Sequence, residues 1–178
     1  SYSASILSYS ERQLNFIYTG IRDIIVHIDD KGRQREFMEE QKVAEETKKC
    51  MITFYHDNPF LQYLHIDVTS IEWGRVRLDM DVKHEHTNVY GIVHGGVTMT
   101  MADTAMGAAC LACNKRVVTL DCTLNFIRAI PEGLHAYALG KVIHNGEHTM
   151  ICEAEVYDEH DTLCVKTQAT FFVLKEFQ

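Results

Sequence analysis

Residues 88–96 read NVYGIVHGG and run directly into an apolar stretch, 97–113, whose only formally charged side chain is Asp103. This stretch is rich in Ala, Gly, Thr and Met and is apolar on nearly every side of a helix. Such a pattern predicts a helix, from about Gly95 to Cys113, that is surrounded by other parts of the fold. A lone carboxylate is costly in those surroundings, so Asp103 is a candidate functional residue.

Alternating patterns predict strands around this helix. Apolar and polar residues alternate over 75–82, 120–126, 135–143, 150–157 and 163–174. A period of two is typical of strands with one face in a core and one in water. Between two of these strands, Asn145-Gly146 predicts a hairpin turn. We therefore expect an α+β domain in which a curved antiparallel sheet of five or six strands surrounds one long central helix.

The first 49 residues carry a helical pattern. Apolar residues recur at three-four spacing over 14–28, after a capping-box sequence at 10–13, and again over 37–54. We interpret residues 1–49 as a mainly helical extension, a helical hairpin, attached to a domain of residues 50–178. The alternative reading places strands at 24–28 and 33–37 around the turn Asp29-Asp-Lys-Gly32.

Composition excludes several classes of function. The chain has 178 residues, 46% of them hydrophobic and 24% charged, which is ordinary for a folded protein. Its formal charge of -8 argues against nucleic-acid binding. The stretch 97–113 is short for a membrane span and contains Asp103, and the N-terminus lacks the basic leader of a secretion signal. We expect a cytoplasmic protein that does not bind membranes.

The six cysteines predict reduced, mostly buried thiols rather than disulfides, because a chain with a sizeable core needs no cross-links. Cys110-Leu-Ala-Cys113 has the spacing of a redox or zinc motif. No second cysteine pair completes a tetrahedral site, however. His84-Glu-His86 is interpreted as a solvated loop. We therefore expect no metal.

Gly95 and Gly96 are candidates for an oxyanion site, because the first amides of a helix point outward without partners and glycine lets a carbonyl approach closely. A glycine pair required only for tight packing is the alternative. Asp103 lies eight residues beyond Gly95, too far for both to touch one carbonyl in a single chain. A two-fold dimer would bring them together. Asn88 and His94 add an amide and an imidazole near the helix start.

The motif Asn88-x-x-Gly91-x-x-His94-Gly95-Gly96, followed by Ala102-Asp103, resembles the PaaI-like hotdog-fold acyl-CoA thioesterase family. The resemblance covers residues 53–174 and leaves residues 1–49 unmatched. It implies a hotdog fold and hydrolysis of acyl-CoA thioesters by a homodimer or homotetramer, without a metal or other cofactor. The acyl group, small, medium or aryl, is not readable from the sequence.

The same resemblance implies roles for individual residues. Asp103 would be the general base or nucleophile, Gly95 the oxyanion donor, Asn88 and His94 positioning groups, and Thr119 a holder of the hydrolytic water. The candidates for binding coenzyme A are Gly96, Arg128, Lys141, Asn145 and Gly146.

Two other functions compete with this interpretation. A hotdog hydratase would carry its own catalytic His and acid pattern, whereas a single acid in the central helix suits hydrolysis. A non-catalytic acyl-CoA sensor would use the hotdog domain as a ligand pocket and residues 1–49 as an effector element. Retention of Asp103 favours the enzyme, and the extension lacks the basic recognition helix of a DNA-binding regulator.

Overall fold

The computed structural model describes residues 24–28, 34–38 and 42–177. The chain divides into two compact units, residues 1–41 and residues 42–178. In the first unit, β1 (Ile24–Ile28) pairs in antiparallel register with β2 (Gln34–Met38), and Val26 lies opposite Glu36.

The prediction of a helical hairpin over residues 1–49 is wrong for residues 24–28 and 34–38, whereas residues 45–49 are helical, as the second predicted helix requires. Residues 24–28 and 34–38 are strands, as in the alternative reading, because an isoleucine- and valine-rich segment followed by an Asp-Asp-Lys-Gly turn favours a β-hairpin. The predicted capping box at residues 10–13 lies outside the described residues. The expected boundary after residue 49 falls inside a helix of the larger unit, α2 (Glu45–His56).

The helix α2 belongs to the larger unit because it buries Met51 completely. A short helix, α3 (Pro59–Leu64), follows. The Asn58 side chain accepts hydrogen bonds from the backbone N–H groups of Phe60 and Leu61, at 3.0 and 3.3 Å. A capping Asn followed by Pro at the first helical position is a strong start signal.

The sheet of the larger unit has six antiparallel strands in the order β3-β4-β6-β7-β8-β5. These are β3 (Asp67–Glu72), β4 (Arg75–Asp81), β5 (Lys115–Phe126), β6 (His135–Asn145), β7 (Thr149–Asp158) and β8 (Leu163–Glu176). The strands β3 and β5 form the two edges. Six strands agree with the expected five or six, and each alternating segment became a strand.

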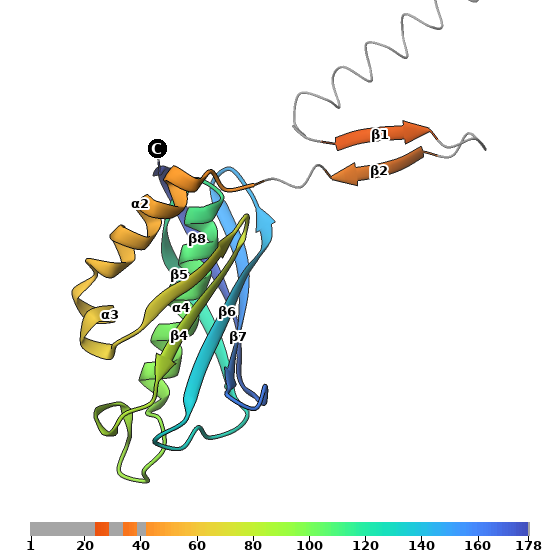
Figure 1. Cartoon of the computed structure of the whole chain (residues 1–178). Helices are drawn as coiled ribbons and strands as arrows, with labels where there is room; N and C mark the ends of the chain where they lie inside the picture. The colour runs from red at the N-terminus through yellow and green to blue at the C-terminus, as the bar shows by residue number, and fades with distance from the viewer. Residues whose placement is uncertain (1–23, 29–33, 39–41, 178) are drawn as a thin grey trace, which may run out of the picture. The chain divides into compact units, whose positions relative to one another are not determined.

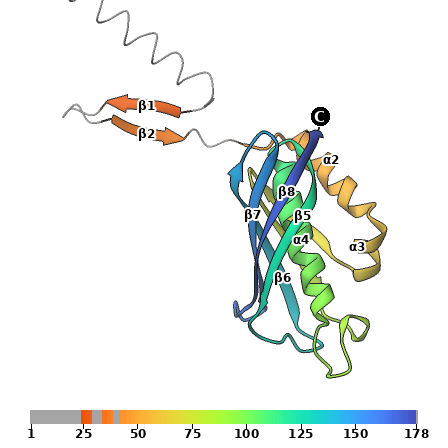
Figure 2. The ribbon, with the colours of Figure 1, turned by 180° about the vertical axis from the view of Figure 1, so that it is seen from behind.

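The central helix is α4 (Gly95–Ala112), which ends one residue before the predicted limit. Figures 1 and 2 show that it lies between the sheet strands β6 and β7 on one side and α2 and α3 on the other. A Cβ on Gly140 of β6 would lie only 2.2 Å from the carbonyl oxygen of Ala105. Helix and sheet therefore approach to backbone contact at this point, which only glycine permits.

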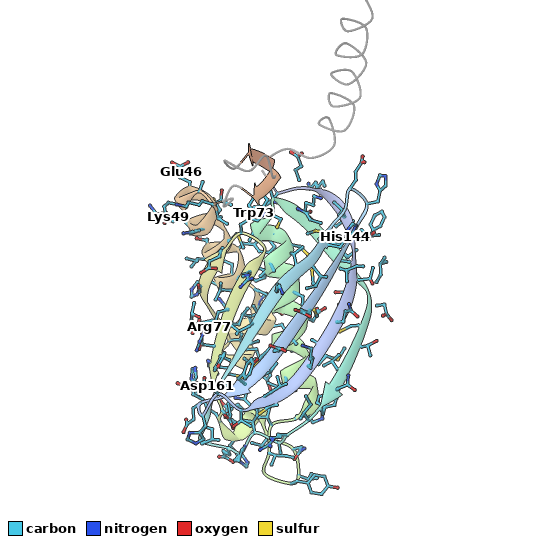
Figure 3. All side chains as sticks on the ribbon, turned by 90° about the vertical axis from the view of Figure 1, so that its right-hand side faces the viewer. Glu46, Lys49, Trp73, Arg77, His144 and Asp161 are labelled. Carbon is cyan, nitrogen blue, oxygen red and sulfur yellow. The ribbon has the colours of Figure 1, made fainter. Side chains whose placement is uncertain are left out.

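The outer face of the sheet, seen in Figure 3, carries charged and aromatic side chains. The Arg77 guanidinium lies 3.9 Å from the centre of the Tyr137 ring, and the Tyr137 hydroxyl donates to Asp161. Burial alone would raise the pKa of Asp79, but hydrogen bonds from Arg77, Thr69 and His135 outweigh it and lower the pKa to about 2. This face is thus a polar surface held in a fixed arrangement. No helix among the described residues is long and apolar enough to cross a membrane.

Candidate functional site

The N-terminus of α4 leaves one amide available. His94 is the N-cap residue, and its Nδ1 accepts a hydrogen bond of 2.9 Å from the Gly96 N–H. The His94 carbonyl accepts the Val97 N–H at 2.9 Å. The Gly95 N–H has no acceptor among the described residues. Of the two predicted glycines, Gly95 is therefore the one whose amide can bind a ligand oxygen.

Hydrogen bonds fix both the backbone and the side chain of His94. Its N–H donates to the carbonyl of His86 over 2.8 Å. Because Nδ1 accepts from Gly96, a neutral His94 ring carries its proton on Nε2, which can donate to a ligand. The side chain is exposed.

His86 corrects the prediction that residues 84–86 form a solvated loop. His84 is exposed, but the His86 side chain is completely buried, and its Nδ1 accepts the Lys83 N–H at 3.0 Å. Burial lowers the pKa of His86, so the ring is neutral near pH 7. Its polar flanks, Glu85 and Lys83, concealed this role in the sequence. The residue anchors the segment that leads into α4.

A cavity of about 270 Å³ opens beside the free Gly95 amide. Asn88, Thr98, Phe126 and Arg128 are among its lining residues. A Cβ on Gly95 would lie 3.1 Å from the Phe126 ring, so a glycine at this position keeps the amide and the ring close together. Phe126 lies on the apolar face of the alternating segment 120–126, yet 61% of the residue is exposed, and it lines this cavity.

The turn that Asn88 begins fixes the position of its side chain. Its Oδ1 accepts the Tyr90 N–H at 2.9 Å, and its carbonyl accepts the N–H of Gly91, which has a φ of +71°. The positive φ explains the glycine in the motif. The turn holds Asn88 with its NH₂ group free of partners among the described residues and at the cavity wall.

The apolar surroundings of Asp103 in the sequence suggested an enclosed carboxylate. In the structure, Asp103 is half-buried. It lies on the side of α4 that faces β5, and the Thr119 hydroxyl donates to its Oδ1 at 2.8 Å. The strand register shifts between Thr119 and Asp121, which marks a bulge next to this contact. The structure thus brings Asp103 together with Thr119, and separates both from Gly95 by more than two helical turns.

The remaining candidates lie in three places. Arg128 joins Asn88 and Gly95 at the cavity. Lys141 lies on the outer face of the sheet, where its Nζ is 3.4 Å from Glu153. Asn145 and Gly146 accept hydrogen bonds of 2.7 Å from Lys115, at the end of the molecule where α4 finishes. Within one chain, only Arg128 of this set is near the Gly95 amide, apart from Gly96 itself.

Comparison with known proteins adds independent information. A sequence model of the thioesterase superfamily matches residues 90–165. Acyl-coenzyme A thioesterase PaaI of Escherichia coli is 29% identical over 117 residues, 66% of this chain and 81% of the relative. The solved structure of E. coli PaaI covers 75% of this chain and 97% of its own, with a TM-score of 0.71 and 22% identity.

Two further solved structures resemble the larger unit. A conserved protein of Pseudomonas aeruginosa is 30% identical, with a TM-score of 0.63, and the match covers 74% of this chain and 99% of the relative. A Streptococcus mutans protein, solved bound to acetyl CoA, is 26% identical with a TM-score of 0.62, covering 64% of this chain and 91% of its own. The chain therefore belongs to the thioesterase superfamily, as a PaaI-like thioesterase with the hotdog fold.

Proposed function

We propose that this protein hydrolyses the thioester of small or medium acyl-CoA or aryl-CoA substrates, without a metal or other cofactor. The observation that carries the proposal is the Gly95 N–H, the first amide of α4, which has no acceptor among the described residues and borders a cavity. The comparisons support the substrate class, because E. coli PaaI is an acyl-coenzyme A thioesterase and the S. mutans relative binds acetyl CoA.

In the proposed reaction, the acyl carbonyl oxygen accepts a hydrogen bond from Gly95. Negative charge grows on this oxygen when the carbonyl is attacked, and the positive end of the α4 dipole lies at the same place. The NH₂ of Asn88, which lines the cavity, and the Nε2–H of His94, the residue before Gly95, would orient the thioester or a water. The thiolate of coenzyme A then leaves as the carbonyl reforms.

Asp103 supplies the base or the nucleophile in this proposal. An ionised carboxylate can either activate water or attack the carbonyl directly, and both routes need the same position. The hydroxyl of Thr119 fixes one carboxylate oxygen and leaves the other free to act. Eight helical residues separate Asp103 from Gly95, about 12 Å along the axis, so the two cannot serve one carbonyl within a single chain.

A homodimer built through β5 resolves this separation. The strand is an edge of the sheet, and its exposed apolar residues include Val118, Leu120 and Phe126. Thr119 marks the Asp103 end of the strand and Phe126 the Gly95 end. If two copies of β5 pair in antiparallel fashion about a two-fold axis, each Asp103 approaches the Gly95 amide of the partner. A homotetramer would be two such dimers.

Arg128 is the proposed contact for the phosphate groups of coenzyme A, since it is the cation that lines the cavity beside Gly95 and Asn88. Gly96 would contribute only its open backbone, because its N–H is already bound to His94. Lys141, Asn145 and Gly146 lie away from this cavity in the chain, so their part in binding would require the neighbouring subunit.

Mixing two inactive variants tests the shared site. Asp103→Asn removes the base, and Gly95→Val blocks the approach to the amide; we expect each to lower kcat at least ~100-fold. In a mixture that exchanges subunits, half of the dimers are mixed, and each mixed dimer holds one intact site. Release of free thiol from acyl-CoA should then recover to about a quarter of the wild-type rate.

Asp67→Asn is the matched control, because Asp67 is an exposed carboxylate on the other edge strand and should leave the rate unchanged. Absence of recovery, with subunit exchange verified by mass labelling, would rule out a site shared between chains. Tight binding of acyl-CoA by the wild type without thiol release would instead identify a sensor and overturn the enzymatic proposal.

A further inference from the structure

Three cysteines meet where α4 ends. The sulfur of Cys110 lies 3.3 Å from the sulfur of Cys152, which comes from the middle of β7. Cys113, the C-cap residue of α4, is 5% exposed and lies beside Gly74. Cys110 and Cys152 are completely buried. The paired Cys110-x-x-Cys113 spacing, which the thioesterase site does not use, therefore belongs to a thiol cluster between the helix and the sheet.

The other cysteines have different surroundings. Cys122 lies 3.3 Å from the Thr167 hydroxyl, and the Cys164 thiol donates to the Thr162 carbonyl. Cys50 is exposed on α2. Among the described residues, Cys110 and Cys152 are the pair whose sulfur atoms touch each other.

The cluster favours the reduced state at rest. The contact with Cys152, together with burial, raises the pKa of Cys110, and burial raises the pKa of Cys113 to about 11. Because the thiolate is the reactive form, these thiols react slowly at neutral pH. Only a small oxidant that enters the core can reach them, and Cys113 is the most exposed cysteine of the three, at 5%.

We propose that Cys110 and Cys152 form a disulfide when the protein meets a hydroperoxide, and that this bond fastens α4 to β7. A disulfide has a sulfur–sulfur distance of about 2.05 Å, so the sulfurs need to approach by only about 1.2 Å. Both partners lie on regular elements already packed together, which makes large backbone movement unnecessary.

The chemistry balances with hydrogen peroxide as the oxidant. The sulfur of one thiol attacks a peroxide oxygen, the O–O bond breaks, and a sulfenic acid and one water form. The second thiol attacks the sulfenic sulfur, the S–S bond forms, and a second water leaves. The two thiols lose two electrons and two protons in total, and the peroxide is reduced to two waters.

The bond would mainly change stability rather than catalysis. It closes a loop between positions 42 residues apart, and such a loop restricts the unfolded chain. Asp103 and Gly95 lie about two and about four helical turns before Cys110, on the half of α4 that does not carry the bond. We expect the oxidised protein to keep its thioesterase rate within about twofold and to melt at least ~5 °C higher.

The test uses the full chain with Cys50→Ser, which removes the exposed thiol. After treatment with hydrogen peroxide, free thiols are alkylated under denaturing conditions and the protein is digested without reductant. We expect a cross-linked peptide joining Cys110 to Cys152, a mass lower by two hydrogen atoms, and reversal of the melting shift by dithiothreitol.

Matched variants separate this pair from its neighbour. Cys152→Ala and Cys110→Ala should abolish the cross-link and the melting shift, whereas Cys113→Ala should retain both. If Cys110 and Cys152 remain fully alkylatable in the peroxide-treated Cys50→Ser protein, or if the cross-link joins Cys113 instead, the proposal is wrong. The peptide map of the Cys50→Ser protein decides this even if an alanine variant fails to fold.

Discussion

The two halves of α4 are built from similar small and apolar residues but meet opposite surroundings. In the second half, Ala105 to Ala112 are buried against the sheet, apart from the half-buried Gly107. In the first half, Gly96 and Met99 are exposed, and Asp103 is half-buried. The second half is thus enclosed, whereas part of the first half stays accessible. The accessible half carries every polar group that we assign to catalysis on the helix.

We expect the largest effect from replacing Gly140, which contacts the enclosed half of α4. Gly140→Ala places a Cβ 2.2 Å from a backbone oxygen that cannot move by itself, so α4 and β6 have to separate. We expect a loss of about 3 kcal/mol in the free energy of unfolding, measured by urea denaturation.

Gly107→Ala is the control on the same helix. The nearest atom to its new Cβ is 3.9 Å away, and alanine favours the helix, so stability should stay equal or rise by up to ~1 kcal/mol. Equal stability of Gly140→Ala and wild type would mean that helix and sheet do not touch as described.

Thr119 tests the accessible half with a smaller effect. Thr119→Ala removes a hydrogen bond to the Asp103 carboxylate, a kind of bond worth about 1.5 kcal/mol or more, so we expect kcat to fall about tenfold with little change in KM. Thr119→Ser keeps the hydroxyl and should restore most of the rate. A fall in stability without a fall in kcat would assign Thr119 to structure alone.

We expect the smallest effect from replacing His86, which should change how the free energy of unfolding depends on pH. Its pKa is lowered in the folded protein below the usual 6.5, so the unfolded chain binds the proton more readily. The stabilising contribution of the neutral ring is complete above pH 6.5 and is lost as the pH falls below it. Urea denaturation at pH 7.5 and 5.5 should show less of this acid sensitivity in His86→Gln.

The pKa of His135 is shifted in the opposite direction to that of His86, so the two histidines should affect stability in opposite ways as the pH changes. Hydrogen bonds to Asp81 and Asp79 raise its pKa, so its stabilising contribution is present below pH 6.5 and is lost as the pH rises through the raised value.

If His86→Gln left the acid sensitivity unchanged, the buried ring of His86 would not be the source of that sensitivity.

Much of the larger unit was predictable because its signals are local. The period of two located five of the six strands, β4 to β8. The start of α3 is also a local signal, since the capping side chain of Asn58 and Pro59 act within one turn. The segment at 24–38 misled because short apolar runs fit both helix and strand, and the pairing of Ile24 with Met38 is made by residues far apart in sequence. The burial of His86 was not predictable, because it depends on which distant parts of the chain pack against the ring.

The amino-acid sequence alone specified the apolar helix, its lone Asp103, the glycine pair at its start and the antiparallel strands, because periodicity and capping are encoded by near neighbours. Only the folded chain showed which amide stays free, that Thr119 reaches Asp103 across a bulge, and that Cys110 meets Cys152. Those contacts join residues on different elements, and long-range packing, rather than local preference, sets the distances between them.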